Sequence, residues 1–240
     1  MGTKERRERA KDATRQKILD AARELFAREG YEAVSMRRIA DAIEYSPTAI
    51  YVHFKDKADL MKELCHLDYE AFTSQAQQFA DVADPIERIR LLARSYIQFA
   101  IEHPNHFRLM FMTKLTPEVV EMDEEEMRER GRGDPSRDGY AFLMQCVQQA
   151  IAQGWVREDL QHDPELVAQI LWAGGHGVAS LQVTRLEKEP WFNWKGADAL
   201  GEATLLAVLR GILRDEVMPG LDGAAAPPVT RSLLDGRNGT

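Results

Sequence analysis

The chain has 240 residues, which is enough to bury at least one hydrophobic core and allows one or two domains, of which we expect two. Hydrophobic residues make up 44% and charged residues 29%, a composition typical of globular proteins that excludes a disordered, fibrous or membrane class. No apolar run approaches the roughly 18 residues of a membrane span, and the charged N-terminus lacks the apolar stretch of a signal peptide. We therefore expect a cytoplasmic protein.

Charge is distributed unevenly along the chain. The net charge is −8, but residues 1–60 hold 13 Lys and Arg against 11 Asp and Glu, whereas residues 61–240 hold 18 against 28. The first 17 residues hold seven basic and three acidic residues. On charge alone, such an arm is as compatible with a solvated, frayed terminus as with a nucleic-acid contact, so the neighbouring segments have to decide.

Local start and stop signals predict four helices near the N-terminus. An apolar stripe that includes Ile18 and Phe26 predicts a helix over 14–29, and Gly30 is suited to end it in a left-handed cap. Capping residues then open three more helices, which follow Ser35 (to about Ile43), Ser46 with Pro47 (47–53) and Asp56. Two short helices joined by a tight turn and packed on a third form a helix-turn-helix.

The side chains of the predicted third helix suit the major groove of DNA. Ile50 and Phe54 are expected to face the core, while the opposite side meets DNA. Small groups for base edges are Ser46, Thr48 and Ala49, and groups for phosphate oxygens are Tyr51, His53, Lys55 and Lys57. A second phosphate site is expected at Ser35, beside Arg37 and Arg38. Singly, each charge could equally be a solvated surface group, but together they fit one geometry.

Residues 14–60, and above all the segment SMRRIADAIEYSPTAIYVHFKDKADL (35–60), resemble the DNA-binding domain of the TetR/AcrR family of transcriptional regulators. The resemblance implies that Tyr51, His53, Lys55 and Lys57 hold the phosphate backbone and that Ser46, Pro47 and Thr48 face bases.

Two positions depart from the family pattern. Glu44 stands where relatives usually carry glycine, at a position expected to need a positive φ, which costs a non-glycine residue about 1 kcal/mol or more. Arg38 stands where many relatives carry an acidic residue that completes a capping box, and we expect it to contact phosphate instead.

Helical periodicity continues downstream, without strand patterns or a nucleotide-binding glycine loop. The predicted helices lie near 57–80, 85–103, 105–112, 116–130, 138–153, 164–187 and 196–216. The charged, glycine-rich stretch 121–139 is expected to be an exposed helix end and a loop. We predict an all-α protein with a helix-turn-helix domain (1–60), a larger helical effector-binding and dimerisation domain (61–218) and a flexible tail (219–240).

The C-terminal part resembles the Trp-His-Gly subgroup of the family through FAIEHPNHFRLMF (99–111) and through Trp172, His176 and Gly177. The resemblance implies a homodimer through 164–187 and 196–216. Glycines within 164–187 permit close helix approach, although they could instead mark a kink inside one subunit. The resemblance also implies an effector pocket, for which the candidates are Tyr96, Phe99, His103, Phe107, Phe111, Leu143, Val147, Trp172 and His176. Such an aromatic stripe is equally compatible with plain core.

Metal, disulfide and cofactor chemistry is not expected. The two cysteines, Cys65 and Cys146, lie in apolar helical patterns without zinc or disulfide spacing and are expected to be reduced core residues. His103 and His106 are three residues apart, but Pro104 breaks the helix that would direct both rings to one ion. No catalytic side-chain set is recognisable, so an enzyme is not expected.

The sequence therefore predicts a DNA-binding transcriptional regulator. The expected mechanism is a repressor that is released from its double-stranded operator when a small apolar or aromatic effector binds. Two alternatives remain open at this point: an activator of the same architecture, and a helical ligand-binding protein without specific DNA binding.

Overall fold

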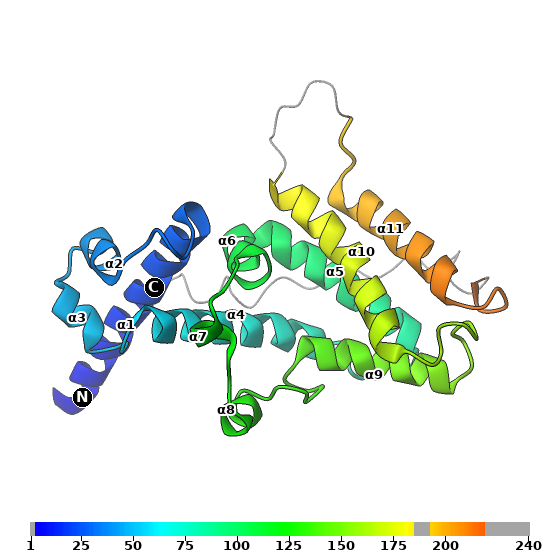
Figure 1. Ribbon diagram of the computed structural model, residues 1–240, viewed down its shortest axis with the longest axis horizontal. Coiled ribbons are helices and arrows are strands. Elements are labelled where there is room, and N and C mark those ends of the chain that lie inside the picture. Colours follow the sequence, from blue (N-terminus) through cyan, green and yellow to red (C-terminus); the bar gives the residue numbers. More distant parts are fainter. Residues whose placement is uncertain (1–2, 185–192, 219–240) are drawn as a thin grey trace. The chain divides into compact units, whose positions relative to one another are not determined.

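The structure, a computed structural model, describes residues 3–184 and 193–218 (Figure 1). Across these residues the regular structure is helical, and the β-type pairing is limited to an isolated bridge between Val156 and Leu213. The all-α prediction is therefore confirmed. No helix in the described ranges is both long and apolar enough to cross a bilayer. The predicted tail, 219–240, lies outside the described residues.

The helices are distributed over two compact units. The first unit contains residues up to Tyr69 and Asn105–Met127, and the second contains Glu70–Pro104 and the residues from Arg128 onward. In chain order the helices are α1 (Thr3–Glu29), α2 (Met36–Ala42), α3 (Pro47–Tyr51), α4 (Lys57–Gln77), α5 (Pro85–Glu102), α6 (Pro104–Phe107), the π-helix η1 (Arg108–Met112), α7 (Pro117–Val120), α8 (Glu124–Glu129), α9 (Gly139–Ala152), α10 (Pro164–Thr184) and α11 (Ala197–Ile212).

Local capping sets the first three helices, as the sequence predicts. The Ser35 hydroxyl accepts a hydrogen bond from the Arg38 amide (3.1 Å), and the Ser46 hydroxyl accepts one from Ala49 (3.3 Å). Gly30 ends α1 in the left-handed region with φ +85°. The non-glycine residue predicted to need a positive φ, Glu44, has φ +59° and occupies the turn between α2 and α3.

One apolar core holds the helix-turn-helix together within the first unit. The α1 stripe at Ile18, Ala22 and Phe26 is buried, and it belongs to the same cluster as Ile39 of α2 and Ile50 of α3. Burying each large side chain contributes roughly 1.5–3 kcal/mol, and this burial holds the short α3 in place. Propensity alone does not stabilise a five-residue helix.

Three of the predicted helices differ most from those in the structure. Helix α1 begins at Thr3 rather than near residue 14, because residues 4–13 are mostly Lys, Arg, Glu and Ala, which favour helix without any apolar face. The predicted helix 105–112 is divided into α6 and the π-helix η1. The predicted helix 116–130 is divided into α7 and α8, because the Asp123 carboxylate accepts a hydrogen bond from the Glu126 amide (2.8 Å) and caps a new helix start.

The cysteine prediction holds for one of the two residues. Cys146 of α9 is fully buried, and burial raises the pKa of its thiol to about 11. Cys65 of α4 is only partly buried and packs against the edge of the first unit's core. Both cysteines are free thiols.

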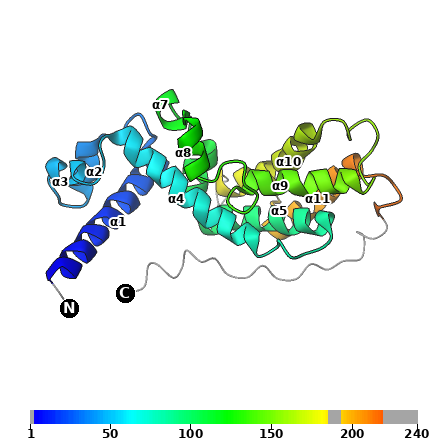
Figure 2. The ribbon, with the colours of Figure 1, turned by 90° about the horizontal axis from the view of Figure 1, so that it is seen from below.

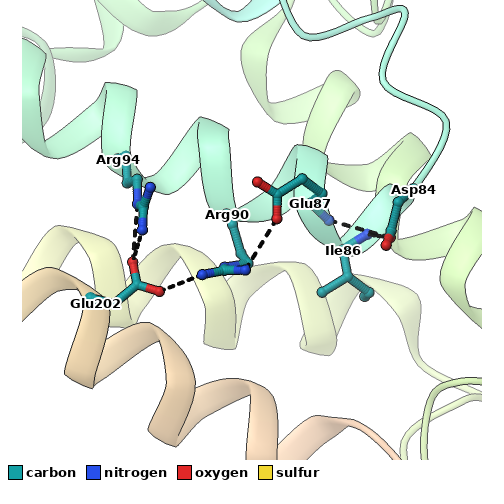
Figure 3. Close-up of polar contacts among 6 residues, drawn as sticks. All are labelled: Asp84, Ile86, Glu87, Arg90, Arg94 and Glu202. Atoms are coloured by element: carbon teal, nitrogen blue, oxygen red, sulfur yellow. Dashed lines mark hydrogen bonds and ion pairs between the residues drawn. The ribbon is translucent and has the colours of Figure 1, made fainter. Parts of the chain in front are cut away.

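In the second unit, α10 packs against α5, α9 and α11 (Figure 2). A charged cluster joins α5 to α11 across this packing (Figure 3). The buried Arg90 donates to Glu202 (2.7 Å) and to Glu87 (3.2 Å), and Arg94 Nε donates to the second Glu202 oxygen (3.0 Å). Burial by itself would raise the pKa of the Glu202 carboxyl, but the hydrogen bonds and charges of Arg94 and Arg90 outweigh it and lower that pKa.

Candidate nucleic-acid interface

Helix α3 lies on the core with its opposite side exposed. Ile50 is fully buried, and Phe54, three residues beyond the end of α3, is 2% exposed. The residues predicted to face bases stand on the other side: Ser46, Pro47 and Thr48 are exposed, and Ala49 is partly exposed. The helix ends at Tyr51, two residues earlier than predicted, but its N-terminal face is free to approach a base pair.

The four predicted phosphate ligands beyond this face are not equivalent. Tyr51 is 55% exposed, and Lys55 is exposed and has no ion-pair partner among the described residues. The Lys57 ammonium instead donates to the Tyr31 carbonyl oxygen (2.9 Å) and lies 4.2 Å from the centre of the Tyr31 ring. Lys57 therefore already connects the start of α4 to the end of α1, while Lys55 and Tyr51 are available to a ligand.

The predicted second phosphate site lies at the start of α2. Ser35, Arg37 and Arg38 are all exposed. The Arg38 guanidinium donates to Glu29 (3.2 Å), so a protein carboxylate partly compensates its charge. Arg37 has no such partner among the described residues and is the stronger candidate for a phosphate contact.

A groove of about 440 Å³ lies beside the end of α3 and is lined by Glu8, Lys11, Asp12, Arg15, Val52 and His53. Arg15 is fixed there by an ion pair with Glu63 (2.6 Å) and by the Phe54 ring, whose centre is 5.1 Å from the guanidinium carbon. Lys11 and Arg15 are not among the contact residues predicted above. The signal that could have found them is their spacing of four residues, which places both on one side of α1.

His53 at this groove is poorly suited to carry a proton. Its Nδ1 atom is buried without a hydrogen-bond partner among the described residues. Burial, followed by the positive charges of Lys11 and Arg15, lowers the pKa of the ring below its ordinary value of 6.5. Below about pH 6.5 the unfolded chain therefore binds more protons than the folded chain, and stability decreases as the pH falls.

We expect the free energy of unfolding to fall between about pH 7.5 and about pH 5.5, and His53→Gln to reduce that fall. Denaturant titrations at both pH values measure it, with the exposed His162→Gln as the matched control that keeps the wild-type decrease. The pKa of His176 is also lowered by burial, so His176 contributes to the decrease in unfolding free energy that remains in His53→Gln. An identical decrease in the wild type and in His53→Gln would contradict the assignment.

The predicted effector residues fall in both units. Phe107 and Phe111 belong to the first unit, where their ring centres are 5.3 Å apart. The other seven belong to the second unit. Among these, Phe99, Leu143 and Val147 are buried, which agrees with the alternative that they are core.

Three of the candidate effector residues form a hydrogen-bonded chain. Trp172 Nε1 donates to the Tyr96 hydroxyl (3.3 Å), which lies 2.9 Å from His176 Nδ1. Burial lowers the pKa of His176, so its ring is neutral near pH 7 and Nδ1 can accept a hydrogen bond from the Tyr96 hydroxyl. Trp172 remains 40% exposed, so this chain reaches the surface of the second unit.

The two histidines weighed as a metal pair lie in different surroundings. His103 is in the second unit, with its ring centre 5.4 Å from that of Phe99. His106 is in the first unit, and its Nδ1 lies 3.0 Å from the buried Asp68 carboxylate. No group of three metal-ligating side chains occurs in the described part of the chain.

Comparison with known proteins identifies both halves of the chain. A family model described as "Bacterial regulatory proteins, tetR family" matches residues 18–64, and "Tetracyclin repressor-like, C-terminal domain" matches residues 89–190. An HTH-type transcriptional regulator of Staphylococcus aureus (strain MRSA252) is 35% identical over 96 residues, which are 39% of this chain and 52% of that protein. The chain thus spans about half the length of the curated relatives it matches.

Solved structures share the fold over most of the chain. A TetR family regulator from Marinobacter aquaeolei VT8 aligns with a TM-score of 0.66 and 20% identity, covering 86% of this chain and 98% of the other. The ketosteroid transcriptional regulator KstR2 of Mycobacterium tuberculosis aligns with a TM-score of 0.61 and 21% identity. The alignment covers 84% of this chain and 96% of KstR2. AibR, solved in complex with isovaleryl coenzyme A and operator DNA, aligns with a TM-score of 0.60 and 21% identity. The alignment covers 80% of this chain and 95% of AibR.

These relatives are transcriptional regulators and not enzymes. Membership of the Trp-His-Gly subgroup stays a prediction. Both matched models describe one family and together they cover more than half of the sequence, and the helix-turn-helix and the fold agree with them. The chain therefore belongs to the TetR family of DNA-binding transcriptional regulators.

Proposed function

We propose that this regulator is a ligand-responsive repressor that binds its operator as a homodimer and leaves it when a small apolar or aromatic effector binds the second unit. The observation that carries the DNA-binding part is the two-sided character of α3. Ile50 is buried, while Ser46, Pro47 and Thr48 are exposed next to it. A five-residue helix held in this way matches the groove-binding helix of a helix-turn-helix.

Within this proposal the contacts divide by chemistry. Ser46, Pro47, Thr48 and Ala49 face base edges, because their small side chains allow close approach. Tyr51, His53, Lys55, Ser35, Arg37 and Arg38 bind phosphates and fix the register of the protein on the duplex. The Lys57 ammonium donates to the Tyr31 carbonyl oxygen, so the role proposed for Lys57 is to hold the start of α4 in position and not to bind a phosphate.

The dimer is proposed to form through 164–187 and 196–216, of which 185–187 lie outside the described residues. Helix α10 has the exposed apolar residues Leu166, Ala173 and Leu181 on one side, and α11 has an exposed row of small residues, Ala199, Ala203 and Ala207. A second copy of the same surface would bury both rows across a two-fold axis. The localisation we propose is the cytoplasm, where operator DNA is accessible.

The glycines of α10 have different surroundings. A Cβ atom on Gly174 would lie 3.1 Å from Val208 of α11, so this glycine serves packing inside one subunit. A Cβ atom on Gly177 would meet no atom within 4 Å, so this position is open to a partner. The continuous α10 from Pro164 to Thr184 supports close packing at these positions.

The effector is proposed to bind in the second unit near the chain formed by Trp172, Tyr96 and His176. The partly exposed Trp172 offers an apolar surface and His176 a polar end, a combination common in small-molecule sites. Phe99, Leu143, Val147 and His103 would form the adjoining wall within the second unit, whereas Phe107 and Phe111 belong to the first unit. AibR, which shares the fold, was solved in complex with isovaleryl coenzyme A and operator DNA, which supports a ligand site in addition to the DNA-binding site.

A substitution pair tests the DNA-binding proposal. Lys55→Ala is expected to weaken binding to all DNA sequences alike, by about 5-fold to 10-fold, and to lower the slope of log affinity against log salt by about 1. Thr48→Ala is expected to change preference at one base position by about 1–3 kcal/mol. Fluorescence anisotropy on duplexes that the wild type selects from a random pool measures both effects.

The charge-matched control is Lys195→Ala, an exposed lysine of the second unit, which should bind like the wild type. Unchanged affinity and preference in both test variants would rule out the proposed docking. Wild-type binding that is weak, unselective and strongly salt-dependent would favour the alternative of a ligand-binding protein without specific DNA binding.

A reporter placed behind the selected operator separates the two regulatory roles. A repressor gives higher expression when its gene is deleted, whereas an activator of the same architecture gives lower expression. Release by effector is tested in the same strain with candidate ligands, and release from DNA by an apolar compound would support the proposed mechanism.

A further inference from the structure

The first three turns of α1 form a charged helix that covers no core. Residues 4–13 are helical and exposed, and in Figure 2 the N-terminal end of α1 extends beyond α2 and α3. They carry most of the basic arm seen in the sequence. The basic arm is therefore a continuous part of α1, and helical geometry sets the direction in which its side chains project.

Several basic residues at the start of α1 follow the same stripe as the apolar residues further along this helix. Lys4, Arg7, Lys11 and Arg15 are separated by three, four and four residues, and Ile18 follows three residues later. At 100° per residue the four cations fall within an arc of about 80°. One side of α1 is therefore basic up to Arg15, and the same side faces the helix-turn-helix core from Ile18 onward.

The groove beside α3 fixes where this basic side points within the first unit. Lys11 and Arg15 line it together with Val52 and His53, which follow directly on α3. Arg7 and Lys4, one and two turns before Lys11 on the same stripe, project from the same side of the helix-turn-helix. No ion pair is made by Lys4, Arg7 or Lys11 with any residue that the structure describes.

The groove itself is not suited to a small anion. Glu8 and Asp12 line it, and Arg15 is already paired with Glu63. The cations that remain available lie along α1 and span about 10 Å, at 1.5 Å per residue from Lys4 to Lys11. A linear row of this length matches about three phosphates on one strand of a duplex.

We propose that Lys4, Arg7 and Lys11 form an additional, sequence-independent DNA contact, to phosphates that flank the base pairs read by α3. This proposal rests on the proposed function, because the duplex has to be seated on α3 first. The α1 contact adds affinity and salt dependence without adding base preference, since phosphates are the same at every position.

A charge-matched pair of triple variants tests the contact in the full-length chain. The first variant combines Lys4→Ala, Arg7→Ala and Lys11→Ala. The control combines Arg6→Ala, Arg9→Ala and Lys17→Ala, which removes the same charge from the opposite side of the same helix. Alanine favours helix, and circular dichroism checks that both variants keep the helix content of the wild type.

Binding is measured on two duplexes that the wild type selects from a random pool, one with flanking base pairs on both sides and one trimmed to the selected site. On the long duplex the first variant is expected to lose about tenfold or more in affinity, and its salt slope to fall by about 2–3. On the trimmed duplex it should bind like the wild type. The control should lose less than about threefold on either, and base preference should be unchanged throughout.

Equal losses in both variants, or no loss in the first, would overturn the α1 contact. So would a loss that persists on the trimmed duplex, because flanking phosphates would then not be involved. A wild-type chain that selects no sequence would instead remove the proposed function itself, and this outcome is visible before either variant is measured.

Discussion

Asp68→Asn is expected to lower the free energy of unfolding by about 3 kcal/mol, because it removes the buried carboxylate partner of the Arg23 guanidinium and leaves only the exposed Asp20. Asp68 of α4 is 2% exposed and accepts two hydrogen bonds from Arg23 of α1, at 2.8 and 3.2 Å. Its carboxylate also lies 3.0 Å from His106 of α6. One carboxylate therefore links three helices of the first unit.

The matched control uses the other carboxylate on the same guanidinium. Asp20 lies 3.1 Å from Arg23, but its side chain is 53% exposed, so Asp20→Asn should cost less than about 1 kcal/mol. Denaturant unfolding at one fixed protein concentration compares the two, since dimer formation makes stability depend on concentration. Equal losses in the two variants would show that burial of Asp68 is not the cause.

The pH dependence of the wild type provides an independent check on Asp68. Burial by itself would raise the pKa of this carboxyl, but the His106 hydrogen bond and the Arg23 charge outweigh it and lower the pKa from 3.8. A lowered pKa gives stability that is present above the ordinary value and is lost as the pH falls through the folded value. This loss lies below the range in which His53 and His176 act.

Glu202→Ala should cost about 3 kcal/mol in the second unit, because it removes the α11 carboxylate that compensates the charge of the buried Arg90. The Arg90 side chain is 2% exposed, and after the change it keeps its ion pair with the partly exposed Glu87 (3.2 Å). Arg94 loses its partner at the same time (Figure 3). The pair Arg90–Glu202 joins residues 112 positions apart, so its loss loosens α11 from α5.

Two comparisons separate charge from packing at this site. The double variant Arg90→Met with Glu202→Leu removes both charges and should recover at least half of the stability that Glu202→Ala loses. The exposed pair Arg157–Asp159 (3.1 Å) is the control, and Asp159→Ala should leave the stability close to that of the wild type. A double variant no more stable than Glu202→Ala would show that packing, not the less compensated Arg90 charge, causes the loss.

The sequence by itself determined the features that depend on neighbours within one or two helical turns. The caps at Ser35 and Ser46, the end of α1 at Gly30, the positive φ of Glu44 and the burial of Ile50 all agree with the structure. Capping bonds and helical periodicity join residues three or four positions apart, so the local sequence contains both partners. For this reason the helix-turn-helix and the exposed face of α3 could be predicted.

Tertiary structure alone decided which charges are free to meet a ligand. Lys55 and Lys57 are two residues apart, yet only Lys57 is bound, by the Tyr31 carbonyl 26 residues away. Arg23 pairs with Asp68, which is 45 residues away in the sequence. Arg38 of α2 pairs with Glu29 at the end of α1. A long side chain pairs with any carboxylate or carbonyl that packing brings within about 3 Å, and periodicity does not encode that partner. The direction of the α1 cations became clear for the same reason, once the buried stripe fixed how that helix is rotated on its core.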